Sequence, residues 1–319
     1  MITAYREIEG RLARVGDLKQ EGIWIDVVAP APGEIEEVSA ATGLLTELLQ
    51  AALDEKERPR IQTEGDQVLV IISVPVGQSQ LTYVTVPLGI VVSPSFVATV
   101  SLQETEVVSR LAAHARVHTA KRTRLLLQLM LRTAMLYLDY LERLDRLADE
   151  VERRLRRSMA NERLFELLEV QKSLVYFATG LRSNQLVMEK LTRSKLKPPG
   201  QPNDSEGIPL RLYPDDEDVL EDAMTENQQA IMIAEVHNSI LSGTMDAFAS
   251  IISNNLNIVV KFLTAVTIVL AVPTMIASIY GMNVALPGQG SPLAFLGVVG
   301  ASALATLLSG VWLWKRGMF

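Results

Sequence analysis

The sequence contains no cysteine and only three histidines. Without cysteine the chain has no disulfides, no thiolate metal sites and no thiol nucleophile. It also lacks a glycine-rich phosphate loop, a nucleophile elbow and a His-Glu-x-x-His motif, which are short motifs that indicate enzymes. The formal net charge of −7 argues against a nucleic-acid partner and is compatible with attraction of cations. We therefore expect neither an enzyme nor an organic cofactor.

Charged residues are absent from one long part of the chain. Residues 262–314 contain no Asp, Glu, Lys, Arg or His, although 21% of the whole chain is charged. This part divides into two apolar stretches, 258–280 and 293–314, and a bilayer-spanning helix needs about 20 residues. A buried helical hairpin in a soluble protein is the alternative, but the complete lack of charge favours two transmembrane helices.

The charges that flank these stretches predict the orientation in the membrane. Lys261 lies at the start of the first stretch, Lys315 and Arg316 follow the second, and the connection between the stretches is uncharged. Positive charge is enriched on the cytoplasmic side of membrane proteins. The N-terminal segment is charged from Arg6 onward and has no apolar signal-peptide core. We expect a multi-pass protein of the inner (plasma) membrane, in contact with the lipid bilayer, with cytoplasmic N- and C-termini.

The first 120 residues predict a cytoplasmic α/β domain. Four runs rich in Val, Ile and Thr and bounded by Gly, Pro or Asp are typical of strands, and they cover residues 22–30, 67–76, 81–92 and 95–101. Residues 32–53 have apolar positions at helical spacing after a Pro-Gly start.

Long helices are predicted after this domain. Residues 119–195 are rich in Leu, Arg and Glu with a period near 3.6. We interpret their basic run, Arg153, Arg154, Arg156 and Arg157, as a solvated helix face rather than a lipid or nucleic-acid patch. A proline-rich loop follows at 195–209.

Another helix starts at about Asp216 and, with no proline before Pro273, continues to Tyr280. Its first acidic residues, Asp215 to Asp218, are interpreted as helix-capping charges. The expected organisation is an α/β domain at 1–120, a cytoplasmic long-helix region at 121–250 and a two-helix transmembrane domain at 251–319.

Polar and small residues recur on one face of the first predicted span, at steps of three or four. The stripe consists of Asn257, Val260, Leu263, Thr264, Thr267, Ala271, Thr274 and Ser278. Small residues also serve close helix packing in lipid, but the hydroxyls and the amide exceed that need, and polar groups at membrane depth usually face a bundle interior or water. We interpret the stripe as pore lining. One helix cannot enclose a pore, so this predicts an oligomer.

Several motifs resemble one known family. "YGMN" at 280–283 directly follows the first span, and "NIVVKFLT" at 257–264 lies at its start. Together with "WIDV" at 24–27 and with "RPRI" and "GDQVLVII" between 58 and 72, they resemble the CorA family of divalent-cation (Mg²⁺) transporters, which carries a Gly-Met-Asn signature. The resemblance covers nearly the whole chain.

The resemblance implies a funnel-shaped homopentamer with an α/β cytoplasmic domain, long helices pointing to the membrane and a pore of five first helices. It assigns the selectivity filter to Gly281, Met282 and Asn283, with a pore loop at 281–292. It places Thr274 in a polar ring, Val260 and Leu263 at a hydrophobic constriction and Asn257 at the cytoplasmic mouth. Mg²⁺ is then both the transported and the regulatory ion, and Co²⁺ or Ni²⁺ are expected to pass as well.

The resemblance also places the regulatory ion between subunits, at Asp66 and Asp222, with Glu221 as a possible substitute. Facing carboxylates repel one another when empty, and a bound cation would hold the subunits in a closed state.

The sequence departs from the family pattern at three places. Ala271 stands where a bulky apolar residue is common, Pro273 lies one position later than usual, and the loop after the signature has no acidic residue.

A ZntB-like Zn²⁺ transporter is the alternative, since that branch shares the Gly-Met-Asn signature. The lack of Cys and the scarcity of His disfavour it. His114 and His118 have helical i, i+4 spacing and would make half a metal site, but a surface pair without metal is the simpler interpretation. A structural membrane tether would not need Thr267, Thr274 or Asn283.

Overall fold

A computed structural model describes residues 1–79, 81–113, 117–158, 161–193, 208–210, 213–284, 291 and 293–318. The chain divides into two units, Met1–Gly243 and Thr244–Phe319, and each is described by itself. Most of the predicted loop at 195–209 and most of the predicted pore loop at 281–292 lie outside the described residues.

A seven-stranded sheet forms the centre of the first unit, in the order β2-β1-β3-β7-β6-β5-β4. Only β3 and β7 are parallel, and all other neighbours are antiparallel. The strands are β1 (Ile2–Ile8), β2 (Arg11–Val15), β3 (Trp24–Val28), β4 (Arg60–Glu64), β5 (Gln67–Gly77), β6 (Tyr83–Val92) and β7 (Val97–Ser101). The four strands predicted from the sequence are confirmed as β3, β5, β6 and β7.

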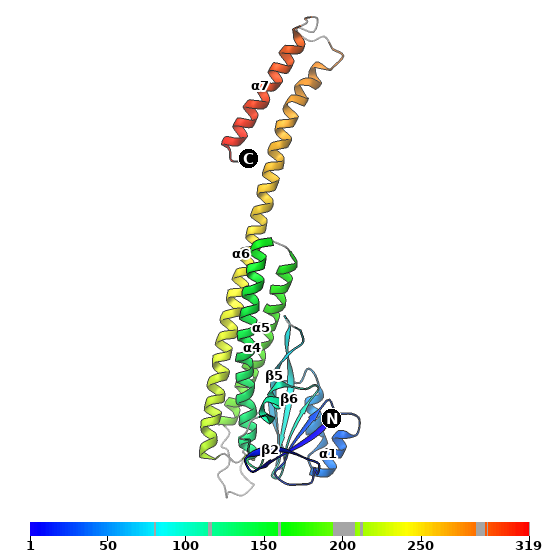
Figure 1. Ribbon diagram of the computed structural model, residues 1–319, viewed down its shortest axis with the longest axis vertical. Coiled ribbons are helices and arrows are strands. Elements are labelled where there is room, and N and C mark those ends of the chain that lie inside the picture. The colour runs from blue at the N-terminus through cyan, green and yellow to red at the C-terminus, as the bar shows by residue number, and fades with distance from the viewer. Residues whose placement is uncertain are drawn as a thin grey trace. The chain divides into compact units, whose positions relative to one another are not determined.

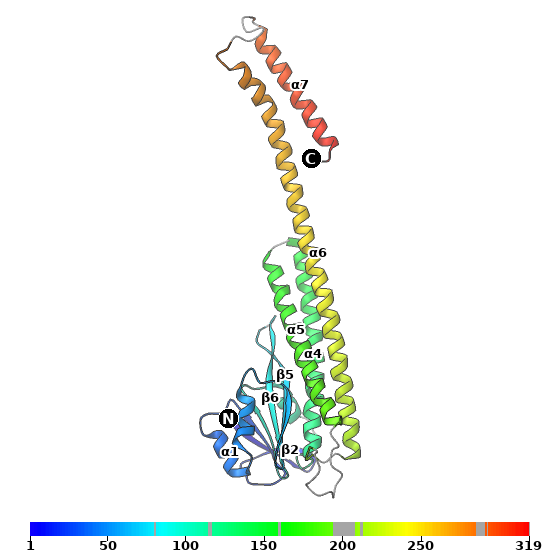
Figure 2. The same ribbon diagram turned by 180° about the vertical axis from the view of Figure 1, so that it is seen from behind.

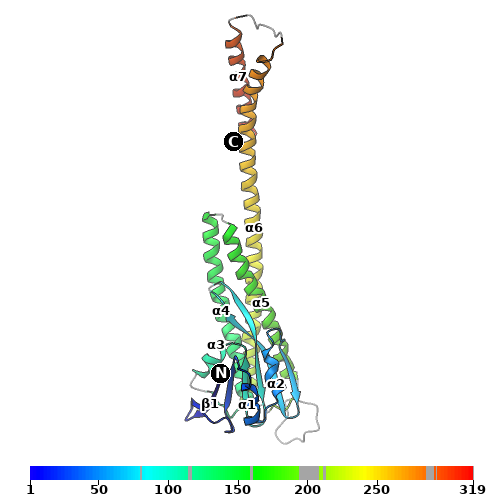
Figure 3. The same ribbon diagram turned by 90° about the vertical axis from the view of Figure 1, so that its right-hand side faces the viewer.

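Small helices cover one face of the sheet. Strand alternation directs Ile25 and Val27 of β3 and Leu69 and Ile71 of β5 into a buried core with α1 (Glu34–Thr42), α2 (Thr46–Gln50) and η1 (Ala51–Leu53). The helical stretch expected at 32–53 is therefore interrupted. Gly43 follows α1 with a φ of +75°, a left-handed conformation that glycine adopts without steric cost. Figure 3 shows α1 and α2 on this side of the sheet.

Long helices pack on the opposite face of the sheet, which gives the unit three layers (Figure 1). They are α4 (Arg122–Ser158) and α5 (Asn161–Arg193), with the short α3 (Glu106–Ala112) beside α4. The side chain of Asn184 on α5 joins this layer to β5, because it accepts from the N–H of Ser73 at 2.7 Å and donates to the carbonyl of Ser73 at 2.8 Å.

Helix α6 (Pro214–Tyr280) is continuous, as the sequence predicts. In the first unit, Asn227 of α6 donates to the carbonyl of Leu181 at 3.0 Å, and Glu235 pairs with Arg182 of α5 at 2.5 Å. The basic run on α4 is confirmed as a solvated face for its described side chains, since Arg154 and Arg156 pair along their own helix with Glu150 and Glu152.

The second unit contains the C-terminal part of α6 and α7 (Ala294–Lys315). In Figure 2 α7 lies alongside the end of α6, and Ser302 donates a hydrogen bond to the carbonyl of Pro273 at 3.4 Å. The most apolar windows of the two helices are only 6% and 0% buried. Exposing apolar helices of this length to water is energetically unfavourable, so both helices are transmembrane spans rather than core helices.

Candidate ion pathway and cation sites

All predicted pore-lining residues are exposed on α6 in the described chain. They are Asn257, Val260, Leu263, Thr267, Ala271, Thr274 and Ser278. The last four also line a groove on the surface of α6, together with Leu270, Met275, Ile279 and Met282. The structure therefore brings Thr267, Ala271, Thr274 and Ser278 to one face.

Helix α7 packs on a different face of α6. The groove between the two helices is lined on the α6 side by Pro273, Ala277, Tyr280 and Gly281, none of which belongs to the polar stripe. The second span thus leaves the stripe uncovered. A polar face left open within a membrane-spanning pair requires either water or another protein surface.

The threonine hydroxyls of the stripe are arranged as acceptors. Thr264, Thr267 and Thr274 each donate their O–H to the carbonyl four residues earlier, in all three cases at 2.8 Å. A hydroxyl has one donor and two acceptor lone pairs. Because the helix uses the donor, only acceptor capacity remains toward the surface.

The Gly-Met-Asn segment follows directly where α6 ends. The N–H of Gly281 donates to the carbonyls of Ala277 at 2.9 Å and Ser278 at 3.2 Å, and the N–H of Met282 donates to Ile279 at 3.3 Å. A side chain at position 281 would meet the carbonyl of Ala277 at 3.3 Å, so glycine suits this close turn. Asn283 is exposed just beyond it.

The predicted regulatory residues are exposed and far apart in sequence. Asp66 lies in the turn between β4 and β5, next to Gly65 with a φ of +62°, and Glu221 and Asp222 lie on α6. No hydrogen bond or ion pair joins Asp66 to either of them, and the described residues contain no group of three or more His, Cys, Asp and Glu suited to a metal. A site at these residues would need ligands from a second chain.

The acidic start of α6 caps the helix. Asp216 accepts a hydrogen bond from the N–H of Tyr213 at 3.1 Å, and Asp215 and Asp216 lie 3.7 and 3.8 Å from Arg124. These contacts confirm the capping interpretation for Asp216.

The predicted helix through His114 and His118 is wrong at His118. Helix α3 ends at Ala112, and Nδ1 of His118 lies 2.8 Å from the carboxylate of Glu7 on β1. His114 lies outside the described residues. The i, i+4 spacing of the two histidines suggested a helix, but His118 lies outside any helix and contacts β1 instead.

One buried carboxylate was not singled out from the sequence. Asp26 lies in the middle of β3 and is 7% exposed. Its signal in the sequence is a charged residue inside the apolar run "WIDVV", where a strand buried on both faces is otherwise expected.

An α/β unit followed by two exposed apolar helices, one with an open polar stripe, defines an integral membrane protein with a candidate ion pathway. Residues 19–316 match the sequence profile of the family described as CorA-like Mg²⁺ transporter protein. The chain belongs to this family of transporters, and it is not an enzyme.

Individual relatives agree with this assignment. The chain is 28% identical over 318 residues to the cobalt/magnesium transport protein CorA of Methanocaldococcus jannaschii, covering 97% of this chain and 95% of the relative. The complete structure of the M. jannaschii CorA magnesium transporter matches with a TM-score of 0.83 at 25% identity, over 99% and 98% of the two chains.

Two further structures share the fold. Full-length CmaX matches with a TM-score of 0.69 at 17% identity, over 98% of this chain and 96% of its own. The cytoplasmic domain of ZntB from Vibrio parahaemolyticus matches with a TM-score of 0.57 at 13% identity, over 80% and 97%. At these identities the likeness concerns the fold alone.

Proposed function

We propose that this protein is a homopentameric channel that passes hydrated Mg²⁺, and also Co²⁺ or Ni²⁺, across the inner membrane. The observation that carries the proposal is the polar stripe on α6, which α7 leaves uncovered and which leads to the exposed Asn283. Five copies of this face around an axis would enclose a path lined by acceptor groups. The printed name of the M. jannaschii relative, a cobalt/magnesium transport protein, supports the choice of ions.

The acceptor character of the stripe suits a hydrated cation. Mg²⁺ gives up its water reluctantly and tends to keep several water molecules. Those waters present O–H donors outward, and Thr267 and Thr274 offer lone pairs because their own protons are used within the helix. Neutral acceptors favour entry without holding the ion too tightly to leave.

Asn283 is assigned to the selectivity filter, with Gly281 and Met282 holding the turn. Five amide oxygens would accept hydrogen bonds from the waters of one ion at the outer mouth. Val260 and Leu263 then form the hydrophobic constriction and Asn257 the cytoplasmic mouth. Ala271 narrows the path less than a bulky residue would.

Flux measurements on purified protein in liposomes test this assignment. Asn283→Ala should abolish selective Mg²⁺ uptake and leave the oligomer intact, because Asn283 is exposed on the described chain. Asn257→Ala serves as the matched control and should reduce uptake less. Wild-type-like uptake by Asn283→Ala, or equal losses in both variants, contradicts the filter assignment. Parallel runs with Co²⁺, Ni²⁺ and Zn²⁺ decide between this proposal and a Zn²⁺ transporter.

Regulation by internal Mg²⁺ is assigned to Asp66 and Asp222 of neighbouring subunits, with Glu221 nearby. Their exposure on one chain leaves both carboxylates open to a partner. In the same liposomes, the double variant Asp66→Asn with Asp222→Asn should still transport but should respond less to internal Mg²⁺. An unchanged response places the sensor elsewhere.

A further inference from the structure

The second unit carries positive charge with almost no acidic side chains. Asp246 is the last Asp or Glu of the sequence, and the only charged side chains after it are Lys261, Lys315 and Arg316. Basic residues at the end of a span are common and by themselves indicate only orientation. What these three residues can bind therefore depends on whether the fold brings them together and whether it gives them partners.

The packing of α7 against α6 brings the three cations to the same level of the helix pair. Helix α7 runs back alongside α6 in Figures 1 and 3, and Ser302 contacts Pro273. At 1.5 Å per residue, about 20 Å of helix separates Ser302 from Lys315. About 18 Å separates Pro273 from Lys261 in the same direction. Both lysines and Arg316 therefore lie at one end of the two spans.

Lys261 lies on the side of α6 that faces α7. Among the described residues of the two spans, only Ala265 of α6 and Leu313 of α7 are fully buried. Since α6 and α7 are the helices described in this unit, these two residues mark where the helices meet. Residues four apart are neighbours on one face of a helix. Lys261 therefore lies beside Ala265, next to the last turns of α7.

A closed turn at the end of α7 positions Arg316. The N–H of Met318 donates to the carbonyl of Leu313 at 3.2 Å, and Gly317 has a φ of +68°. This is the usual way in which a glycine in the left-handed conformation ends a helix. The guanidinium of Arg316 lies 5.2 Å from the centre of the Trp312 ring. A contact of this kind holds the cation in place without neutralising its charge.

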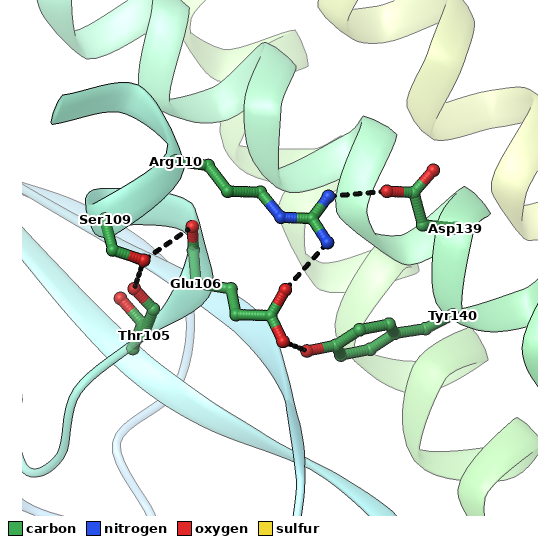
Figure 4. Close-up of polar contacts among 6 residues, drawn as sticks. All are labelled: Thr105, Glu106, Ser109, Arg110, Asp139 and Tyr140. Carbon is green, nitrogen blue, oxygen red and sulfur yellow. Dashed lines mark hydrogen bonds and ion pairs between the residues drawn. The ribbon is translucent and has the colours of Figure 1, made fainter. Parts of the chain in front are cut away.

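The second unit offers these cations no acidic partner. Asp246 is the nearest acidic residue in the sequence, and it precedes Lys261 by about 22 Å on the same continuous helix. Figure 4 shows the contrasting arrangement in the first unit, where Arg110 pairs with Glu106 at 2.7 Å and with Asp139 at 2.5 Å. The cations of the second unit have no such partner among its described residues, so they are available to an anion from outside the chain.

Exposed apolar side chains continue from these cations along α7. Leu308 and Val311 precede Lys315 by seven and four residues, so the three lie on one face of the helix. Leu308 and Val311 are 59% and 42% exposed, and Trp312 and Trp314 are 56% and 70% exposed. Tryptophan is enriched at the level of lipid headgroups. A ligand that combines an anionic head with an apolar chain therefore fits this surface better than free phosphate does.

We propose that Lys261, Lys315 and Arg316 form a binding site for the headgroup of an anionic phospholipid, in the leaflet at this end of the spans. The planar guanidinium of Arg316 presents paired N–H donors that match the oxygens of a phosphate. The two lysines add positive charge from both helices, and the acyl chains lie along the exposed apolar face of α7. The bound lipid joins the end of α7 to α6. The site does not depend on which ions the protein transports.

Quenching of tryptophan fluorescence by lipids with brominated acyl chains tests this site directly. Full-length protein is placed in phosphatidylcholine nanodiscs in which a rising fraction of the lipid is brominated phosphatidylglycerol or, in a parallel series, brominated phosphatidylcholine. Trp312 and Trp314 report on the site, and the fully buried Trp24 of the first unit gives a constant background. Half of the quenching should occur at a several-fold lower fraction of the anionic lipid. Both leaflets of a nanodisc have the same composition, so the orientation of the protein does not affect the result.

Substitutions of the three cations should reduce this preference. The triple variant Lys261→Gln, Lys315→Gln and Arg316→Gln should respond equally to the two lipids. Each single Gln variant should need a several-fold higher fraction of phosphatidylglycerol, because each basic residue contributes to attraction by anionic lipid. These single variants keep the test decisive if the triple variant does not assemble. Arg316→Lys keeps the charge but loses the paired donors, so it should weaken binding less than Arg316→Gln.

A matched control removes the same charge from the first unit. Arg11, Lys19 and Lys56 are exposed there, and replacing all three by Gln should leave the preference for phosphatidylglycerol unchanged.

Equal quenching of the parent protein by the two lipids would overturn the proposal. An unchanged preference in all variants of Lys261, Lys315 and Arg316, or an equal loss in the control, would also do so. Displacement by inorganic phosphate at constant ionic strength would assign the site to free phosphate, and displacement by an oligoglutamate peptide would assign it to an acidic protein segment. All readouts are of lipid binding, so a failure here is distinct from a failure of Mg²⁺ flux.

Discussion

At the scale of single residues, Asp26 makes the stability of the protein depend on pH. Its pKa is about 6 in the folded chain, because of burial, against an ordinary value of 3.8. The folded state therefore holds the proton more tightly, so the stabilisation from protonation is complete below pH 3.8 and is lost as the pH rises through about 6. Above that range, the buried charge lowers the free energy of unfolding by on the order of 3 kcal/mol.

Asp26→Asn should therefore raise the thermal midpoint of the full chain by several degrees at pH 8 in the presence of EDTA. At pH 4 the same substitution should have little effect, because Asp26 is already protonated in the folded state. Thermal unfolding followed by circular dichroism measures both. Glu47→Gln, at an exposed carboxylate on α2, is the control and should change neither midpoint. A gain of equal size at both pH values would show that the buried charge is not the cause.

At the scale of secondary-structure elements, a side chain of α5 satisfies backbone groups of β5 beyond the point where β4 ends. Strand β4 pairs with β5 only as far as Ile71, and Ser73 lies opposite Pro87 of β6, which has no N–H. The backbone groups of Ser73 are satisfied by the amide of Asn184, and its carbonyl also accepts from Tyr137 at 3.2 Å. Gly180 permits this approach, since a side chain there would meet the hydroxyl of Tyr137 at 2.6 Å.

Asn184→Ala should lower the free energy of unfolding by about 1–3 kcal/mol, because the buried N–H of Ser73 loses its acceptor. Hydrogen exchange, measured by mass spectrometry, should become faster in peptides that cover Ser73. Ser183→Ala is the neighbouring control, since that hydroxyl donates to Thr179 of its own helix at 2.9 Å and lies partly exposed. Unchanged exchange at Ser73 in Asn184→Ala would argue that the sheet edge is protected by another group.

The helices and central strands could be predicted from the sequence because their signals are local. Charge-free length marks the spans, and β-branched runs mark β3, β5, β6 and β7. Strands β1, β2 and β4 were not recognised, because each mixes polar with apolar residues, as in "RIQTE" of β4. Their pairing partners define them, and pairing between distant segments is not visible in a local pattern.

The candidate sites also differ in whether a local sequence pattern is enough to predict them. A helical period of three to four residues is enough to place Thr267, Thr274 and Ser278 on one face of α6. The burial of Asp26 was not predicted, because it depends on the packing of other segments against β3. The assignment of Asp66 and Asp222 stays a prediction, since it depends on contacts between chains.

At the scale of the whole molecule, the predicted membrane topology has a simple chemical test. The chain has no cysteine, so single introduced thiols can be labelled without background. In intact cells, a membrane-impermeant maleimide should label Val284→Cys, which lies beyond the first span at an exposed position. Gln103→Cys in the first unit and Met318→Cys after α7 should be labelled only after permeabilisation.

Labelling of Met318→Cys in intact cells would contradict cytoplasmic placement of the C-terminus, and labelling of Gln103→Cys would contradict cytoplasmic placement of the first unit. The two results are independent, because Gln103 precedes the first span and Met318 follows the second. Mg²⁺ uptake by each variant confirms that the labelled protein is assembled.

Pro273 has a mechanical consequence for the second unit. A helix resists bending because successive turns are tied by backbone hydrogen bonds, and a proline removes one of these ties. The last turns of α6, residues 274–280, can therefore bend relative to the rest of the helix at a lower energetic cost than the turns before Pro273. Gly281, which directly follows the end of α6 at Tyr280, and the turn that carries Leu263 lie on opposite sides of Pro273. A movement at one end of the helix is therefore transmitted less fully to the other end.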